Sequence, residues 1–189
     1  RLMEKLDHHH VNVHLNTKVH AILGEKGIVT AVAIEGQDDP LPAEMVVLGS
    51  GIKPNSEIAS AAGIDTGEAG GILVNNRMQT SVDTIYAGGD CVEQDHLVTG
   101  GKTYVPLGPA ANKHGRIAGI NISGGDAVFP GVVGTAVMKV FDLTVARTGL
   151  MESQAAENDF DSFGKTIQSR ERAGYYPNSG HLTVHVVAE

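Results

Sequence analysis

The sequence of 189 residues has a single cysteine, Cys91, and so lacks the thiol pairs from which an internal disulfide framework is built. A lone thiol fits a reducing compartment. The chain also lacks an excess of positive charge, since 14 Lys and Arg residues against 22 Asp and Glu residues give a formal net charge of -8. A nucleic-acid surface needs clustered Lys and Arg to displace phosphate counterions, so this charge argues against a nucleic-acid partner.

Long apolar stretches are missing as well. No run approaches the roughly 20 residues of a membrane-spanning helix, and residues 1–7 lack the apolar core of a secretory signal. We therefore expect a cytoplasmic protein without a membrane partner. Glycine is plentiful, with 24 residues, and 41% hydrophobic and 19% charged content is ordinary for a globular protein with many turns.

Both ends of the sequence look like interrupted elements. Residues 1–6 resemble the last turns of a helix without a capping residue before it. The sequence stops at Glu189, directly after an apolar strand. We expect a fragment of a longer protein.

The first half of the sequence predicts short strands. Apolar residues alternate over 11–15, and the segments 19–23 and 28–34 flank the turn 24–27, which indicates successive antiparallel strands. The apolar run 45–49 is typical of a strand that is buried on both faces. Further along, residues 57–62 predict a helix ended by Gly63, and residues 72–74 predict another strand.

The centre of the sequence predicts a strand followed by a helix. Thr84–Ala87 is expected to be a buried strand that stops at Gly88-Gly89-Asp90, and a helix is expected to begin at Pro109 and run to Ile122. After about residue 126 the order changes to strand, strand, helix, strand and strand, at residues 135–141, 143–148, 152–158, 165–169 and 181–187. This order indicates an α+β unit behind an α/β region.

Gly88-Gly89-Asp90 is the first candidate for a binding site. The glycines let a ligand approach the backbone, and an ionised Asp90 accepts hydrogen bonds from a sugar or ribityl hydroxyl. Taken alone, the tripeptide is more typical of an ordinary turn. The helix after Pro106-Leu107-Gly108-Pro109 adds free N–H groups and the positive end of a helix dipole, which favour a ligand with negative charge.

Three segments carry a resemblance to a known family. Thr80–Cys91 resembles the second FAD motif of pyridine nucleotide-disulfide oxidoreductases, and Pro106–Arg116 is similar to the flavin-facing helix that follows it. Met45–Asn55 is similar to the strand and turn with which the family leaves its NADH domain and returns to its FAD domain. The resemblance covers nearly the whole chain.

The resemblance implies the domain organisation. Residues 1–50 would end the NADH-binding domain, residues 51–125 would form the C-terminal part of the FAD-binding domain, and residues 126–189 an incomplete interface domain. The implied fold class is α/β, with a partial FAD/NAD(P)-binding, Rossmann-like, three-layer region followed by a truncated α+β dimerisation domain. The family forms homodimers through that last domain.

The resemblance also implies which residues bind FAD. Asp90 would hold the ribityl chain, and Leu107 and Gly108 would meet the ring through backbone groups, where the helix end stabilises negative charge on the reduced ring. The expected FAD-binding residues are Gly89, Asp90, Pro106, Leu107, Gly108 and Ala111.

Residues 173–177 resemble the interface domain of coenzyme A disulfide reductases and of NADH-dependent relatives that act on persulfides or oxygen. In that group an interface tyrosine reaches the active site of the partner subunit, so Tyr175 and Tyr176 are the catalytic candidates. Taken by residue type alone, adjacent tyrosines in such a passage more often serve packing, with a hydroxyl at the surface.

The implied activity is electron transfer from NAD(P)H through FAD and a cysteine to a disulfide or persulfide such as coenzyme A disulfide. The alternatives are an NADH oxidase or peroxidase of the same family and a non-catalytic interaction or dimerisation module. The family's two glycine-rich loops and its redox cysteine are missing from this sequence, so the chain alone is expected to be inactive.

The remaining candidates are assigned no chemistry. Cys91 follows an acidic residue, whereas a reactive thiol needs a cation or helix end beside it, so we expect a structural role. Residues 8–10 are three histidines that point in different directions, and no metal is assigned. The basic residues Lys53, Lys113 and Arg116 could contact phosphates, but exposed basic residues on helices are ordinarily solvated.

Overall fold

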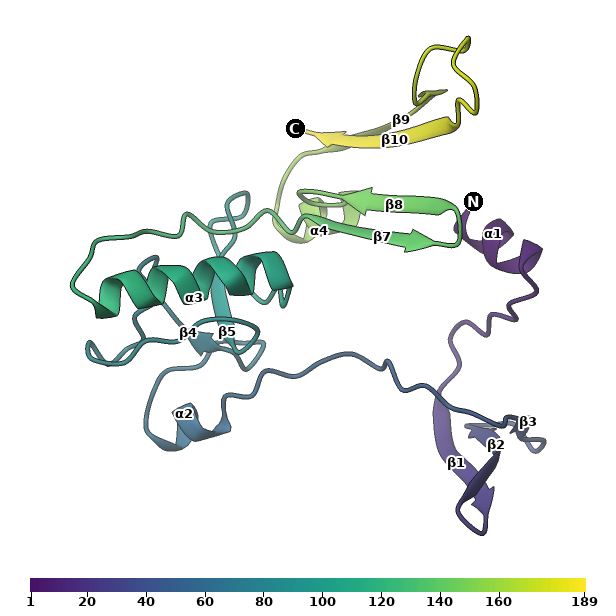
Figure 1. Cartoon of the computed structure of the whole chain (residues 1–189), viewed down its shortest axis with the longest axis horizontal. Helices are drawn as coiled ribbons and strands as arrows, with labels where there is room; N and C mark the ends of the chain where they lie inside the picture. Colours follow the sequence, from purple (N-terminus) through teal and green to yellow (C-terminus); the bar gives the residue numbers. More distant parts are fainter. The chain divides into compact units, whose positions relative to one another are not determined.

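The computed structural model describes residues 1–189, which divide into two compact units. The first unit comprises Arg1–Ile52 and Lys139–Val145, and the second comprises Lys53–Met138 and Ala146–Glu189. Figure 1 shows the elements of both units along the chain. None of the helices combines the length and apolar character needed to span a bilayer.

The first unit contains a helix and a small antiparallel sheet. The helix α1 spans Leu2–His8, and β1 (Val19–Glu25), β2 (Ile28–Ile34) and β3 (Leu41–Pro42) pair in the order β1-β2-β3. Lys26 and Gly27 both have positive φ, at 51° and 80°, which is the backbone twist that a two-residue hairpin needs. The predicted hairpin is therefore confirmed.

Two predicted strands of the first unit are wrong. Residues 11–15 and 45–49 are irregular, and the apolar side chains of the second run are exposed, with Met45 at 81% and Val47 at 86%. A strand needs a hydrogen-bonded neighbour, and no strand of this chain pairs with either segment. Apolar character alone does not supply that neighbour.

The helix α1 packs on a turn that comes much later in the chain. Lys5 Nζ lies 2.8 Å from Asp142 Oδ1, and the His9 ring stacks on Phe141 with 3.6 Å between the ring centroids. Phe141 and Asp142 form the turn between β7 (Ala136–Val140) and β8 (Leu143–Arg147). The first unit therefore combines the beginning of the chain with a turn that comes much later in the sequence.

The second unit contains the hydrophobic core. Its first elements are α2 (Glu57–Ala61), β4 (Ile72–Leu73), β5 (Val92–Asp95), β6 (Lys102–Thr103) and α3 (Gly108–Ile122). Strand β5 lies between β4, its parallel neighbour, and β6, its antiparallel one. Figure 1 shows α3 beside this sheet. The buried core consists of Ala59, Ile64, Ile72, Val74, Met78, Val92 and Phe129.

The predicted strand Thr84–Ala87 is wrong. Only Tyr86 makes a β-bridge, to Gln79, and Ile85 is 39% exposed. Thr80 explains the difference, because its N–H and its hydroxyl both donate to the Ile85 carbonyl, at 3.0 and 3.1 Å. These local bonds occupy backbone groups that a strand would use. Gly88-Gly89-Asp90 consequently precedes β5 instead of ending a strand.

The helix α3 confirms the predicted central helix, one residue longer at its start. Pro109 is its second residue, and Gly124, with a φ of +87°, follows its end. The buried side chain of Asn121 fixes that end, since its Nδ2 donates to the carbonyls of Arg77 and Ala127, both at 2.9 Å. Its Oδ1 also accepts from the N–H of Ala127 at 2.7 Å.

The C-terminal elements confirm the predicted order of strand, strand, helix, strand and strand. After β7 and β8 come α4 (Glu152–Glu157), β9 (Phe163–Arg170) and β10 (His181–Ala188). Strands β7 and β8 form one two-stranded sheet, and β9 and β10 form another with an unbroken antiparallel register from Phe163 to Arg170. Both strands of the last hairpin are longer than predicted.

Candidate functional site

The segment Gly88-Gly89-Asp90 lies directly against α3. A Cβ added to Gly88 would come within 2.9 Å of the Cβ of His114, and one added to Gly89 would lie 4.0 Å from the Cβ of Ala111. Gly89 has a φ of +91°, which a residue with a side chain rarely adopts. The glycines are therefore needed both for close packing on α3 and for the turn itself.

His114 holds this segment to the helix. The side chain is 1% exposed, and its Nδ1 accepts a hydrogen bond from the N–H of Gly89 at 3.2 Å. Burial lowers the pKa of His114, and the nearby charge of Asp90 opposes that shift. The ring packs edge to face with Phe129 at 4.6 Å, and its Nε2 has no hydrogen-bond partner within the chain.

Asp90 presents an unpaired carboxylate. The residue is exposed, and its side chain makes no hydrogen bond or ion pair with the rest of the chain, whereas its carbonyl accepts from the Tyr104 hydroxyl at 2.9 Å. Burial raises the pKa of Tyr104, and the charges of Asp90 and Cys91 add to the shift. The backbone of Asp90 is thus held while its carboxylate stays free to accept hydrogen bonds.

The start of α3 offers one open backbone donor. Pro109 has no N–H, and the N–H groups of Ala110 and Ala111 both donate to the Leu107 carbonyl at 3.0 Å. The N–H of Gly108 has no partner within the chain, and no atom lies where a Cβ of Gly108 would be. A negatively charged or carbonyl-bearing group can therefore approach this helix end.

The structure brings most of the predicted binding residues together. Gly89 lies over Ala111, which is one turn after Leu107, so the turn before β5 and the start of α3 form one site. Its parts suit a ligand that has hydroxyl groups for Asp90 and an electron-rich edge for Gly108. A flavin with its ribityl chain fits this description.

The predicted catalytic tyrosines lie elsewhere. Tyr175 and Tyr176 occupy the loop between β9 and β10, are 84% and 52% exposed, and stack on each other with 5.0 Å between ring centroids. No hydrogen bond joins either tyrosine to the residues beside α3. Within this chain they are not part of the same site.

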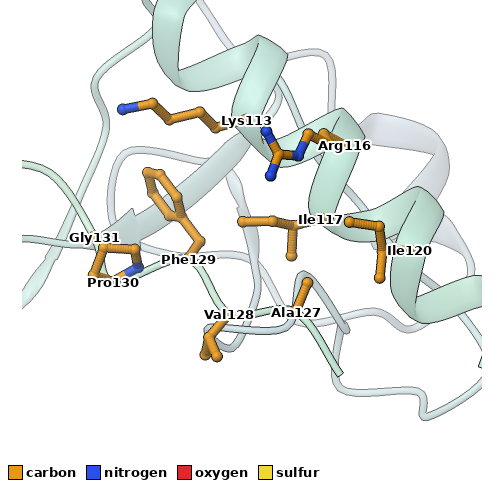
Figure 2. Close-up of a pocket in the computed structure, with 9 residues that line it drawn as sticks. All are labelled: Lys113, Arg116, Ile117, Ile120, Ala127, Val128, Phe129, Pro130 and Gly131. Carbon is orange, nitrogen blue, oxygen red and sulfur yellow. The ribbon is translucent and has the colours of Figure 1, made fainter. Parts of the chain in front are cut away.

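A hollow of about 340 Å³ lies on another face of α3, against the segment 127–131. Figure 2 shows Lys113 and Arg116 leaving the helix above Ile117 and Phe129. Both basic side chains are exposed and form no ion pair, unlike Lys53, whose Nζ lies 3.6 Å from Glu57 Oε1. Phe129 connects the two faces of the helix, because it packs on His114 and also lines the hollow.

Sequence reasoning missed two buried residues. Glu93 is 3% exposed and accepts a hydrogen bond from the N–H of Gly71 at 2.9 Å, with its carboxylate filling the space beside Gly67. The other is His114. The sequence indicated its position only through its spacing of three residues from Ala111, which places both residues on one face of the helix.

Cys91 packs beside the core as a structural residue. It is half-buried, and its Sγ donates to the Gly88 carbonyl at 3.5 Å. This is the one hydrogen bond that its side chain makes.

Replacement of Cys91 by Ala is expected to leave the site beside α3 intact, because the sulfur fills space beside the core and donates a single hydrogen bond. The free energy of unfolding should fall by about 1 kcal/mol, the typical cost of a small core change. Urea unfolding measures the stability, and flavin binding by the complete protein measures the integrity of the site. Loss of flavin binding in a variant that still folds would show that Cys91 takes part in the site.

A glycine turn and a helix start that together receive a ligand are typical of α/β proteins that bind nucleotide cofactors. The chain belongs to the pyridine nucleotide-disulphide oxidoreductase family, whose sequence model matches residues 1–115. Family membership confirms the resemblance that was drawn from residues 80–91 and 106–116.

Individual relatives match the chain from end to end. A protein of Pyrococcus horikoshii named NAD(P)H coenzyme A polysulfide/persulfide reductase is 42% identical over 188 residues, which is 100% of this chain and 41% of the relative. A Methanocaldococcus jannaschii protein named NADH oxidase is 36% identical over 94% of this chain and 39% of its own length. The chain therefore spans about two fifths of these relatives.

A solved structure confirms the fold class. The NAD-dependent persulfide reductase from A. fulgidus superimposes with a TM-score of 0.92 at 46% sequence identity, over 98% of this chain and 34% of the other. The mixed α/β fold class predicted from the sequence is therefore confirmed.

Proposed function

We propose that this chain forms one half of the FAD site of an enzyme that passes electrons from NAD(P)H, through FAD and a cysteine outside the chain, to a disulfide or persulfide such as coenzyme A disulfide. The observation that carries the proposal is the 42% identity, over the whole chain, to the reductase of Pyrococcus horikoshii. The persulfide reductase of A. fulgidus supports the same acceptor class.

The residues beside α3 fit FAD. The free carboxylate of Asp90 accepts hydrogen bonds from ribityl hydroxyls, and the bare backbone of Gly89 lets the chain of the cofactor pass closely. Pro106, Leu107 and Ala111 would hold the ring beside the open Gly108 N–H, which would donate to an electron-rich edge of it. When bound, FAD supplies the relay between two-electron oxidation of NAD(P)H and thiol–disulfide chemistry.

The domain assignment follows the same proposal. Residues 1–50 end an NADH-binding domain, residues 51–125 complete an FAD-binding domain, and residues 126–189 begin a domain through which two copies form a homodimer. The exposure of Tyr175 and Tyr176 leaves their hydroxyls available to the active site of a partner subunit. The enzyme acts in the cytoplasm, without nucleic acid or membrane as partner.

The electron acceptor is tested by NAD(P)H consumption of the complete enzyme with coenzyme A disulfide, a persulfide and oxygen compared side by side. We expect rapid consumption with the disulfide or the persulfide, with thiol formed in proportion to NAD(P)H consumed. Turnover with oxygen alone would refute the disulfide proposal.

An NADH oxidase is the second candidate, because a relative of that name is 36% identical to this chain. A fourth arm of the same experiment tests the chain by itself. Residues 1–189 alone should neither consume NAD(P)H nor retain FAD in a one-to-one ratio. If the complete protein also retained no FAD, a non-catalytic interaction or dimerisation module would be the better account.

A further inference from the structure

Asp90 is held by its backbone on both sides. The preceding residue, Gly89, donates its N–H to Nδ1 of His114 at 3.2 Å, and the carbonyl of Asp90 itself accepts from the Tyr104 hydroxyl at 2.9 Å. These two bonds restrain the backbone on either side of the Asp90 Cα, from which the carboxylate projects. The direction of its carboxylate therefore depends on these two bonds.

The His114 contact is the more deeply buried of the two. The imidazole is 1% exposed, and the close approach of its Cβ to Gly88 leaves no room for the turn to slide along α3. The N–H of Gly89 has no other partner within the chain. Loss of the acceptor would leave this donor unsatisfied and remove one of the two bonds that hold the backbone beside Asp90.

We propose that His114 is a positioning residue for FAD, whose Nδ1 holds the Gly89 N–H and so aims the Asp90 carboxylate at the ribityl chain. The proposal rests on the FAD site proposed above, and it assigns a role to a side chain that does not itself touch the cofactor. It requires the ring to be neutral, since an imidazolium has no acceptor at Nδ1.

The surroundings of His114 keep it neutral at pH 7. Burial lowers the pKa of His114, and the one charge that faces it from the turn, Asp90, opposes the shift. Gly88, Gly89 and Phe129, which pack on the ring, carry no charge, and Lys113 and Arg116 on α3 are exposed. Protonation of His114 therefore requires a lower pH than protonation of an ordinary histidine.

Two substitutions separate the acceptor from the volume of the ring. His114→Asn places a carbonyl oxygen near the position of Nδ1 and cannot be protonated, whereas His114→Leu fills the space without an acceptor. In the complete enzyme stripped of flavin, we expect His114→Leu to raise the Kd for FAD by about tenfold at pH 7.5, which corresponds to one hydrogen bond. His114→Asn should stay within about threefold of the original Kd.

The pH series gives the second readout. The Kd of the original enzyme for FAD, measured by quenching of flavin fluorescence, should rise more steeply between pH 7.5 and pH 5 than the Kd of His114→Asn, because only the original acceptor is lost by protonation. Thermal unfolding of each flavin-free protein reports stability separately. If His114→Leu does not fold, the pH series of the original enzyme and of His114→Asn still tests the positioning role of His114.

The outcomes distinguish the two proposals. Unchanged FAD affinity in His114→Leu, together with a lower melting temperature, would show that His114 only supports the fold. The same pH dependence in His114→Asn as in the original enzyme would also overturn the positioning role. If Asp90→Ala, measured in parallel, bound FAD as tightly as the original, the FAD site itself would be wrongly placed.

Discussion

Replacement of Asp90 by Ala is expected to weaken FAD binding of the complete enzyme by about 10- to 100-fold. A hydrogen bond to a charged group contributes about 1.5–3 kcal/mol, and about 1.4 kcal/mol corresponds to a factor of ten. The carboxylate has no partner within the chain, so its removal leaves no buried group unsatisfied and the fold should be unaffected. Fluorescence titration of the flavin-free enzyme measures the change.

Asp83 provides the matched control. It is an exposed aspartate in the same stretch, and its side chain likewise makes no hydrogen bond or ion pair. Its backbone carbonyl accepts a hydrogen bond from Gln79. Asp83→Ala should bind FAD as the original does. Equal loss of affinity in both variants would point to a general effect of negative charge and against a specific contact by Asp90.

Gly88→Val is expected to lower the free energy of unfolding by about 1–3 kcal/mol, the usual cost of overpacking. The added Cβ would lie 2.9 Å from the Cβ of His114, and that atom cannot move without displacing α3. The shift would separate the turn from the helix, so FAD should be lost as well. Urea unfolding and the flavin content of the purified enzyme report the two effects.

Gly115→Ala on the same helix tests whether the effect is local. Nothing lies within 4 Å of a Cβ at Gly115, and Ala is favoured over Gly inside a helix by about 0.5–1 kcal/mol. This variant should therefore be as stable as the original or more so, with its flavin retained. A Gly88→Val enzyme of full stability and flavin content would show that the turn does not pack on α3 as described.

The sequence alone predicted the elements that depend on residues close to one another in the chain. The β1–β2 hairpin needs only alternating apolar residues and a turn at Lys26-Gly27, and α3 is marked by Pro109 at its start and Gly124 after its end. The strand expected at Thr84–Ala87 failed because a single side chain, Thr80, redirects the backbone hydrogen bonds. The strand expected at Met45–Gly49 failed because apolar residues do not specify a partner strand.

The site was predictable in outline only. The glycines, Asp90 and the helix start could be read from sequence because each follows from the chemistry of a backbone or a carboxylate. The contact that holds the glycine turn could not be read from the sequence, because His114 binds Gly89, which lies far away in the sequence. The same is true of the buried Glu93, which binds the N–H of Gly71. The sequence alone does not distinguish a polar residue that packing buries and hydrogen-bonds from one that is exposed to solvent.

The contact between α1 and the turn at Phe141-Asp142 sets an order for folding during synthesis. The hairpin of β1 and β2 closes between near neighbours, whereas Lys5 and His9 have no partner until the turn after β7 has been made. Closing so long a loop carries an entropic cost that local pairing avoids. We therefore expect α1 to dock late, so that this helix stays open to proteases and chaperones until the turn after β7 has emerged from the ribosome.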